Sequence, residues 1–242
     1  MSTHKRRIKW CKRSPWSGKK HRKVSSLNLE KDKTEETTYF LKMIFSSFGF
    51  NSPIFKEKFA KVIPQDESLQ KKTCLVIPYA GFDTEKTFER EKRGLIEFGF
   101  SPDKIKFVRN RLDITAESPD FIYVPGGNPF KLLRSIKEMN LANAIIDCVQ
   151  NKGATYIGVS AGADIVAKDI AYVLQLEDNN EIINGDYKAL GLILEGVLCH
   201  YDHYSFATLK ACQEVSDGSI ITINDDQLLK YENGSFEYVG EE

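Results

Sequence analysis

The chain has 242 residues, enough for one α/β domain of ordinary size, and its 41% hydrophobic and 28% charged residues are typical of a soluble globular protein. Its formal net charge is zero, and no apolar run approaches the ~20 residues that a membrane-spanning helix requires, so we expect no membrane contact. The two signs are segregated, because residues 1–24 hold ten Lys or Arg and no acid, which leaves 24 basic against 34 acidic residues in the remainder.

The basic start of the chain predicts a separate segment. We expect residues 1–36 to be a disordered extension and residues 37–242 to form a single α/β domain, since highly charged tails bury too little apolar surface to fold. Contact with nucleic acid is the alternative, because Trp10 and Trp16 among the basic residues suit stacking and phosphate contacts. No apolar stretch of ~7–15 residues follows the charges, so we expect no secretory signal.

The five cysteines are scattered along the chain, and no Cys-x-x-Cys pair indicates a metal site or a redox motif. A chain of this length also needs no disulfide staples, so we expect a reducing, cytoplasmic compartment. We further expect no cofactor, and a monomer or a homodimer.

From about residue 40, short apolar runs alternate with longer amphipathic segments. The pattern predicts a strand at 40–45, a short helix at 56–62, a strand at 73–79, a helix at 85–98, and strands at 104–108 and 121–124. Two helices broken near Asn140 follow over 129–148, then a strand at 155–158, a helix at 161–169, an apolar strand ending at 199, a helix at 204–214, a strand at 219–223 and a hairpin over 230–239.

This alternation predicts a three-layer, doubly wound α/β fold, with a mostly parallel sheet and helices on both faces. In such open sheets the ligand site lies beyond the carboxyl ends of the strands. Ser160, the Gly126-Gly127 pair and the residues after Tyr79 all follow predicted strands. We therefore expect them at one edge of the sheet.

The segment from Gly158 to Gly162 fits the Gly-x-Ser-x-Gly nucleophile elbow, with Ser160 as the nucleophile. The chemistry needs a strand that turns at once into a helix, small neighbours, and free N–H groups at the helix start. A strand precedes Ser160 here, and a helical pattern follows it. The alternative is a tight turn that buries an ordinary serine.

A serine hydroxyl needs a base, and histidine serves best near neutral pH. Since His4 and His21 lie in the basic tail, His200 and His203 remain, and we favour His200. A metal bound by His200 with Asp202 or His203 is the rival interpretation. No third and fourth ligand stand at suitable spacing, so we expect no metal.

A carboxylate should orient the histidine. Asp178 lies between Ser160 and His200, which gives the chain order Ser, acid, His, and we place the acid there. Glu177 beside it and Asp225 after a later strand are the alternatives. Each of these acids could equally be an ordinary surface residue.

Glycines at a strand end allow a substrate to approach the backbone closely. We expect the N–H groups of Gly127 and Ala161 to form an oxyanion hole, and Gly126, Asn128 and His203 to contact the substrate. The alternative is a simple turn before the helix that Pro129 begins.

Three segments together resemble the dipeptidase E and cyanophycinase family of serine peptidases. They are VPGGNPFKLL at 124–133, YIGVSAGA at 156–163 and CHYD at 199–202. The resemblance covers about residues 40–240 and picks out His200 over His203. It implies a fold like that of class I glutamine amidotransferases, a Ser-His dyad with an acid, and hydrolysis of dipeptides with an amino-terminal aspartate.

An aspartyl carboxylate is normally bound by an arginine, which holds it bidentately. Arg134 is the last arginine in the chain. The cation must then come from elsewhere, with the candidates Arg90, Arg93, Arg109, Arg111, Lys168 and Lys210.

The sequence thus predicts a serine peptidase that hydrolyses small peptides, aspartyl dipeptides among them, through an acyl-enzyme. An esterase of the α/β-hydrolase type has the same elbow and the same chain order, but would carry more chain after the elbow than the 82 residues present here. An inactive relative that binds a ligand is the other alternative.

Overall fold

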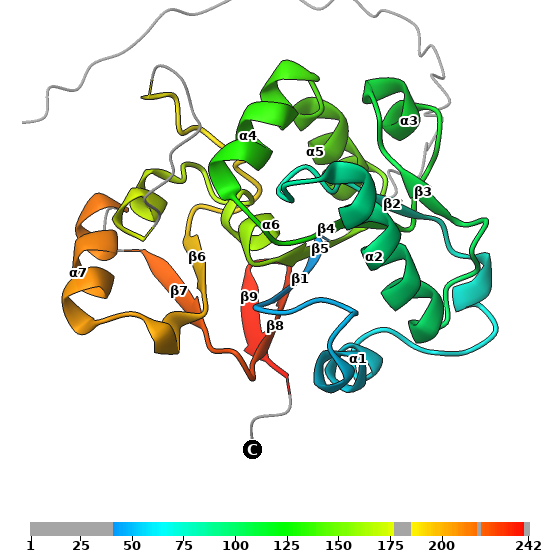
Figure 1. Ribbon diagram of the computed structural model, residues 1–242, viewed down its shortest axis with the longest axis horizontal. Helices are drawn as coiled ribbons and strands as arrows, with labels where there is room; N and C mark the ends of the chain where they lie inside the picture. The colour runs from blue at the N-terminus through cyan, green and yellow to red at the C-terminus, as the bar shows by residue number, and fades with distance from the viewer. Residues whose placement is uncertain (1–40, 177–184, 217–218, 240–242) are drawn as a thin grey trace, which may run out of the picture. The chain divides into compact units, whose positions relative to one another are not determined.

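Parallel strands form the centre of a seven-stranded sheet (Figure 1). The computed structural model describes residues 41–176, 185–216 and 219–239, which belong to one compact unit, Thr38–Glu242. The parallel strands are β1 (Lys42–Ser46), β2 (Cys74–Val76), β3 (Ile105–Phe107), β4 (Phe121–Val124) and β5 (Thr155–Val159). The antiparallel β8 (Leu228–Glu232) and β9 (Ser235–Tyr238) complete the order β3-β2-β4-β5-β1-β8-β9.

A second, two-stranded parallel sheet pairs β6 (Gly196–Cys199) with β7 (Ile220–Ile223). The helix α7 (Phe206–Val215) packs against the 3-10 turn Ala171–Gln175, and Figure 1 shows α7, β6 and β7 together on the left. The alternating pattern predicted both strands, but not that they form a sheet of their own.

Helices cover both faces of the main sheet, as the α/β pattern predicts. They are α1 (Pro53–Ala60), α2 (Thr84–Phe98), α3 (Arg111–Thr115), α4 (Pro129–Glu138), α5 (Ala142–Asn151) and α6 (Ala161–Asp164), and short 3-10 turns span Leu69–Lys71, Ala171–Gln175 and Tyr201–His203. Within the described ranges, none of the helices is long and apolar enough to cross a membrane.

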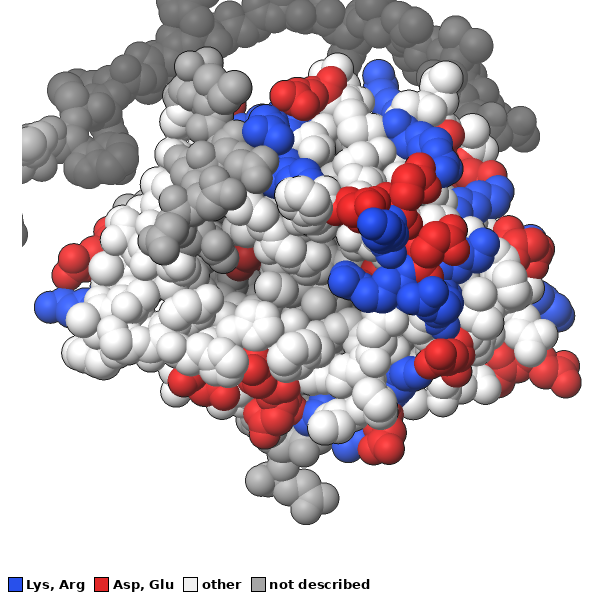
Figure 2. All heavy atoms as spheres, in the orientation of Figure 1, with Lys and Arg blue, Asp and Glu red and all other residues white. Residues whose placement is uncertain are grey.

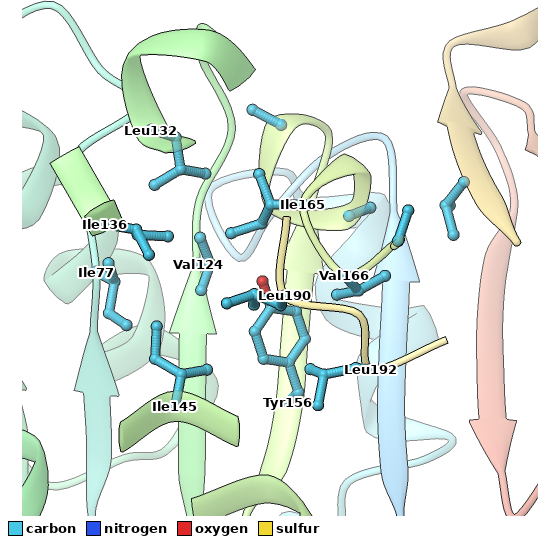
Figure 3. Packing of buried hydrophobic residues seen from close by; sticks show 14 of the residues in the cluster. Ile77, Val124, Leu132, Ile136, Ile145, Tyr156, Ile165, Val166, Leu190 and Leu192 are labelled. Carbon is cyan, nitrogen blue, oxygen red and sulfur yellow. The ribbon is translucent and has the colours of Figure 1, made fainter. Parts of the chain in front are cut away.

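Successive side chains of each strand point to opposite faces of the sheet, and the buried residues therefore form two core layers, one on each face. Val124 and Tyr156 face α4 and α5, where Ile136 and Ile145 pack against them (Figure 3). Their neighbours Tyr123 and Ile157 face the other way, toward the apolar residues of α1 and α2. The predicted three-layer α/β fold is confirmed.

The helix predicted over 161–169 is wrong in its length, because α6 ends at Asp164. The backbone carbonyls that would continue it accept hydrogen bonds from another segment. Those of Ile165, Val166 and Ala167 accept from the N–H groups of Leu190, Leu192 and Gly191, at 2.9 Å each. A tertiary contact thus replaces the local helical pattern after its first turn.

Two of the sequence predictions fall outside the described residues. They are the basic extension at 1–36 and the pair Glu177 and Asp178.

The close packing of α6 on the sheet depends on Gly162. A Cβ atom added there would lie 2.0 Å from the carbonyl oxygen of Val124, far inside van der Waals contact. We expect Gly162→Ala to lower the free energy of unfolding by about 1–3 kcal/mol, because overpacking forces the backbone to move. Urea denaturation monitored by circular dichroism measures the change, and an unaltered midpoint would contradict it.

Candidate active site

Ser160 lies at the junction of β5 and α6, at the carboxyl edge of the sheet. Its backbone has φ 48° and ψ −114°, a left-handed conformation that L-residues rarely adopt and that clusters at functional sites. Its N–H donates to the Ser46 carbonyl at 3.0 Å, and its carbonyl accepts from the Ala163 N–H at 2.7 Å. The surrounding backbone therefore holds Ser160 in the geometry of a nucleophile elbow.

The glycines of the elbow are required by close packing rather than by their own torsion angles. A Cβ atom on Gly158 would lie 2.5 Å from the Gly162 carbonyl oxygen. Together with the approach of Gly162 to Val124, this contact explains why small residues stand on both sides of Ser160.

His200 follows β6 directly and also has a left-handed backbone, with φ 57° and ψ 31°. Its Nδ1 lies 2.5 Å from Oδ1 of Asp225, which comes just after the neighbouring strand β7. The two residues meet because parallel strands end at the same edge. Since Nδ1 is engaged by Asp225, Nε2 is the nitrogen left for a proton transfer.

The second carboxylate oxygen of Asp225 contacts His203, with 2.8 Å between Nε2 and Oδ2. The sequence prediction gave His203 a substrate contact. The structure places its ring against Asp225, with about 60% of the side chain exposed. Asp225 thus joins two histidines through its two oxygens.

Ser47, which follows β1 directly, connects this strand to His200 and to the segment that carries Asp225, and the sequence analysis did not single it out. Its Oγ accepts the His200 N–H at 3.1 Å and donates to the Asn224 carbonyl at 3.1 Å. Because Ser46 holds Ser160, the end of β1 positions both the predicted nucleophile and the predicted base. The signal that could have identified Ser47 is the pair of polar residues Ser46 and Ser47 at the carboxyl end of an otherwise apolar strand, the edge where the site is expected.

Ser160 and His200 line one cavity of about 430 Å³, together with Gly126 and Gly127. Ser160 Oγ makes no hydrogen bond to His200 or to any other residue that the structure describes. In enzymes without substrate, such catalytic contacts are often long and tighten on binding. The edge of the Phe48 ring packs on the His200 imidazole, with 5.3 Å between centroids.

The predicted oxyanion donors lie beside Ser160. A Cβ atom on Gly126 would be 3.1 Å from that of Ser160, and Gly127, at φ +146°, fits against the Ala80 carbonyl, which a Cβ would approach to 2.2 Å. Across 41–176, 185–216 and 219–239, neither Gly127 nor Ala161 directs its N–H into a hydrogen bond. Both groups therefore remain available to an oxyanion.

Asn128, which the sequence prediction assigned to substrate contact, begins α4. Its side-chain oxygen accepts the Lys131 N–H at 2.8 Å, and its own N–H donates to the Ala80 carbonyl at 2.9 Å. The first bond is that of an N-cap and the second ties the residue to the end of the segment 77–80, so Asn128 fixes the glycine turn beside the site.

A polar cluster around the buried Glu91 carboxylate lines the same cavity. Glu91 accepts hydrogen bonds from the Tyr123 hydroxyl at 2.7 Å, from Asn51 Nδ2 at 2.9 Å and from Arg90 Nε at 2.9 Å. Burial and the Glu91 carboxylate raise the pKa of Tyr123 well above its ordinary value, which keeps the hydroxyl protonated as a donor. The sequence analysis missed this cluster, because three separate elements supply it.

Removal of the Glu91 carboxylate is expected to destabilise the fold. Only 4% of its side chain is exposed, and Glu91→Ala leaves the buried Tyr123 hydroxyl without its acceptor, whereas the exposed Asn51 and Arg90 side chains can turn to water. We expect a loss of about 1–3 kcal/mol in the free energy of unfolding. Urea denaturation measures it, with the exposed neighbour Glu89→Ala as the control; equal midpoints for the two variants would contradict the prediction.

One cluster has the spacing of metal ligands. A single ligand atom from each of Asp202, His203 and Asp225 lies within 4.8 Å of the others. Asp225 already contacts both histidines through its two oxygens, and a closed metal site would need a fourth ligand.

Cys199 is the other nucleophilic side chain next to the site. Burial and the Asp164 carboxylate raise the pKa of its thiol well above the ordinary value. Because the thiolate is the nucleophilic form, this shift disfavours Cys199 as a nucleophile.

Comparison with known proteins decides the family. The model of peptidase family S51 matches residues 43–239, most of the chain. The chain belongs to this family. The S51 assignment identifies it as a peptidase and confirms the resemblance that the three sequence segments indicated.

Relatives of this S51 peptidase have related names. An uncharacterized peptidase of Listeria monocytogenes is 34% identical over 167 residues, which cover 66% of this chain and 78% of the relative. A probable alpha-aspartyl dipeptidase of Drosophila melanogaster is 31% identical over 135 residues, which cover 56% of this chain and 55% of that protein.

A solved structure supports the fold. The crystal structure of a Listeria monocytogenes protein assigned as a peptidase E superimposes with a TM-score of 0.66 at 25% identity, over 82% of this chain and 98% of that one.

Proposed function

We propose that this S51 peptidase is a serine peptidase that hydrolyses small peptides through an acyl-enzyme on Ser160. The observation that carries the proposal is the strained Ser160 in the same cavity as a histidine whose Nδ1 is bound by a carboxylate. Strain at the nucleophile, a base, and an acid that orients the base are the three parts that the chemistry needs.

The proposed reaction begins when Ser160 Oγ attacks the carbonyl carbon of the scissile peptide bond. His200 Nε2 takes the hydroxyl proton, and Asp225 stabilises the imidazolium through Nδ1. The oxyanion accepts hydrogen bonds from the N–H groups of Gly127 and Ala161. His200 then gives its proton to the leaving amine as the peptide bond breaks. A water molecule, deprotonated by His200, attacks the ester on Ser160, and His200 returns that proton to Ser160 Oγ as the carboxylic acid product leaves.

Asp225 is the acid in this proposal, rather than Asp178 or Glu177. Its support is the 2.5 Å contact with His200. A third group within hydrogen-bond reach of the base is the arrangement that fixes the tautomer of a catalytic histidine.

The substrate class is supported by the cavity and by the relatives. A volume of about 430 Å³ is in the range of small-ligand sites. The Drosophila melanogaster relative is named a probable alpha-aspartyl dipeptidase, and one of Haemophilus influenzae is named peptidase E. We therefore propose dipeptides and similarly short peptides as substrates.

A panel of dipeptides with varied amino-terminal residues, assayed beside p-nitrophenyl esters, tests the proposal. A peptidase cleaves some of the dipeptides, whatever its rate on the chemically activated esters. Cleavage of esters alone would favour the esterase, and no turnover of either class would favour a relative that only binds a ligand.

A further inference from the structure

Arg90 is the guanidinium that lines the Ser160 cavity. Among the described residues around this cavity, the charged side chains are Arg90 and Glu91, with the ionisable His200 opposite. Arg90 also lines an adjoining cavity of about 1000 Å³, and the two cavities share Gly126 and Gly127. Figure 2 shows Lys and Arg side chains, mixed with acidic ones, gathered over the part of the surface that carries α2.

The Arg90 guanidinium is held in place by its neighbour. Its Nε and Nη2 lie 2.9 Å and 2.8 Å from Oε1 of Glu91, whose Oε2 accepts from Tyr123 and Asn51. The negative charge of Glu91 is thus shared among several donors. While Glu91 is 4% exposed, the Arg90 side chain is 53% exposed.

An arginine has five N–H donors in a rigid fork. Two of them point at Glu91, so the other three, on Nη1 and Nη2, remain for a ligand. A preoriented, half-exposed guanidinium is suited to a planar carboxylate, which it can bind bidentately.

We propose that Arg90, oriented by Glu91, binds a carboxylate of the peptide whose scissile bond lies at Ser160. This inference rests on the proposed function. Arg90 is then the residue that determines specificity, and Glu91 is a positioning residue.

The other cations of this surface are engaged or lie elsewhere. Lys86 pairs with Asp83 at 3.2 Å, and Lys131 Nζ donates to the backbone carbonyl of Gly81 at 2.5 Å. Arg109 pairs with Glu85 and stacks on Phe107, with 4.2 Å to the ring centroid. Arg93, one turn after Arg90, lines only the adjoining cavity.

The carboxylate can come from an acidic side chain or from the carboxyl terminus of a short peptide. Two matched pairs of substrates distinguish these sources. Asn-Leu differs from Asp-Leu by lacking the side-chain carboxylate, and Ala-Leu-amide differs from Ala-Leu by lacking the terminal carboxylate.

The first experiment measures kcat/KM for both pairs with the full-length protein and with Arg90→Gln, Arg90→Lys and Arg93→Gln. We expect the parent to prefer the carboxylate in at least one pair by about 10–100-fold, the value of a charged hydrogen-bonded contact. Arg90→Gln should reduce that preference to below threefold, and Arg90→Lys should retain part of it. Arg93→Gln, with the same charge change on the same helix, should keep the parental ratio.

A structural role of Arg90 would lower the rates for both members of a pair and leave their ratio unchanged. An unchanged ratio in Arg90→Gln, an equal loss in Arg93→Gln, or a parent without preference in either pair would overturn the proposal.

Calorimetric binding to Ser160→Ala separates this proposal from the proposed function. The same four peptides should bind with the same preference, and adding Arg90→Gln should remove it. If the parent cleaves no peptide but binding retains this pattern, the peptidase proposal fails and the Arg90 site stands. If Ser160→Ala binds acid and amide members alike, the Arg90 site is refuted.

Discussion

Ser160→Ala is expected to lower kcat/KM for the best dipeptide by about 10⁴- to 10⁶-fold, because without the Oγ no acyl-enzyme can form. Residual turnover from the oxyanion donors and substrate binding would account for the remaining rate. The measurement is a comparison of steady-state kinetics for the parent and the variant on the same substrate. Ser101→Ala, on the exposed turn before β3, is the control and should keep the parental rate.

The same variant also tests the alternative that Ser160 is an ordinary buried serine in a tight turn. Ser160→Ala removes a strained left-handed serine but no hydrogen bond of its side chain to a described residue, so its stability should be close to that of the parent. A folded Ser160→Ala protein with more than a tenth of the parental kcat/KM would contradict the assignment.

Asp225→Asn is expected to lower kcat by about 10³- to 10⁴-fold, which is the second largest effect. An amide at this position removes the charge that stabilises the imidazolium, and its NH₂ group can favour the wrong tautomer of His200. The change is measured on the same dipeptide, with KM recorded separately. Asp226→Asn is the matched control, since Asp226 is exposed and its side chain does not contact His200.

The alternative acids are tested alongside. Asp178→Asn and Glu177→Gln should change kcat less than tenfold if Asp225 orients His200. A loss of 10³-fold or more in Asp178→Asn, with Asp225→Asn near the parental rate, would return the role to Asp178.

The candidate nucleophile and base could be located in the sequence because local patterns point to them. A strand, an abrupt turn with small residues, and a helix start single out Ser160, and the position after an apolar strand singles out His200. The structure brings these two residues to one cavity at the carboxyl edge of the sheet, where the parallel α/β pattern places ligand sites.

The proposed acid could not be chosen in this way, because its position depends on strand pairing. Asp225 comes after His200 in the chain, and it reaches the imidazole because β7 pairs with β6. Chain order favoured Asp178, which has no such signal of its own. Sequence patterns predicted both β6 and β7 but not that they pair.

The polar cluster of Arg90, Glu91, Tyr123 and Asn51 likewise could not be predicted, because its residues come from segments that lie far apart in the sequence. Its members come from α2, from β4 and from the loop before α1. On the sequence, Arg90 and Glu91 are two charges in a charged helix, the usual pattern of a solvated face. Only the burial of Glu91 under Tyr123 distinguishes this pair from the others on α2.

The central claim, that Ser160 is a nucleophile activated by His200, is tested most directly by labelling the full-length protein with a fluorophosphonate and mapping the adduct by peptide mass spectrometry. We predict one adduct, on Ser160, whose rate of formation falls by more than 100-fold in His200→Gln and is unchanged in His21→Gln. An adduct on another residue, or equal labelling of Ser160 in the parent and in His200→Gln, would contradict the account.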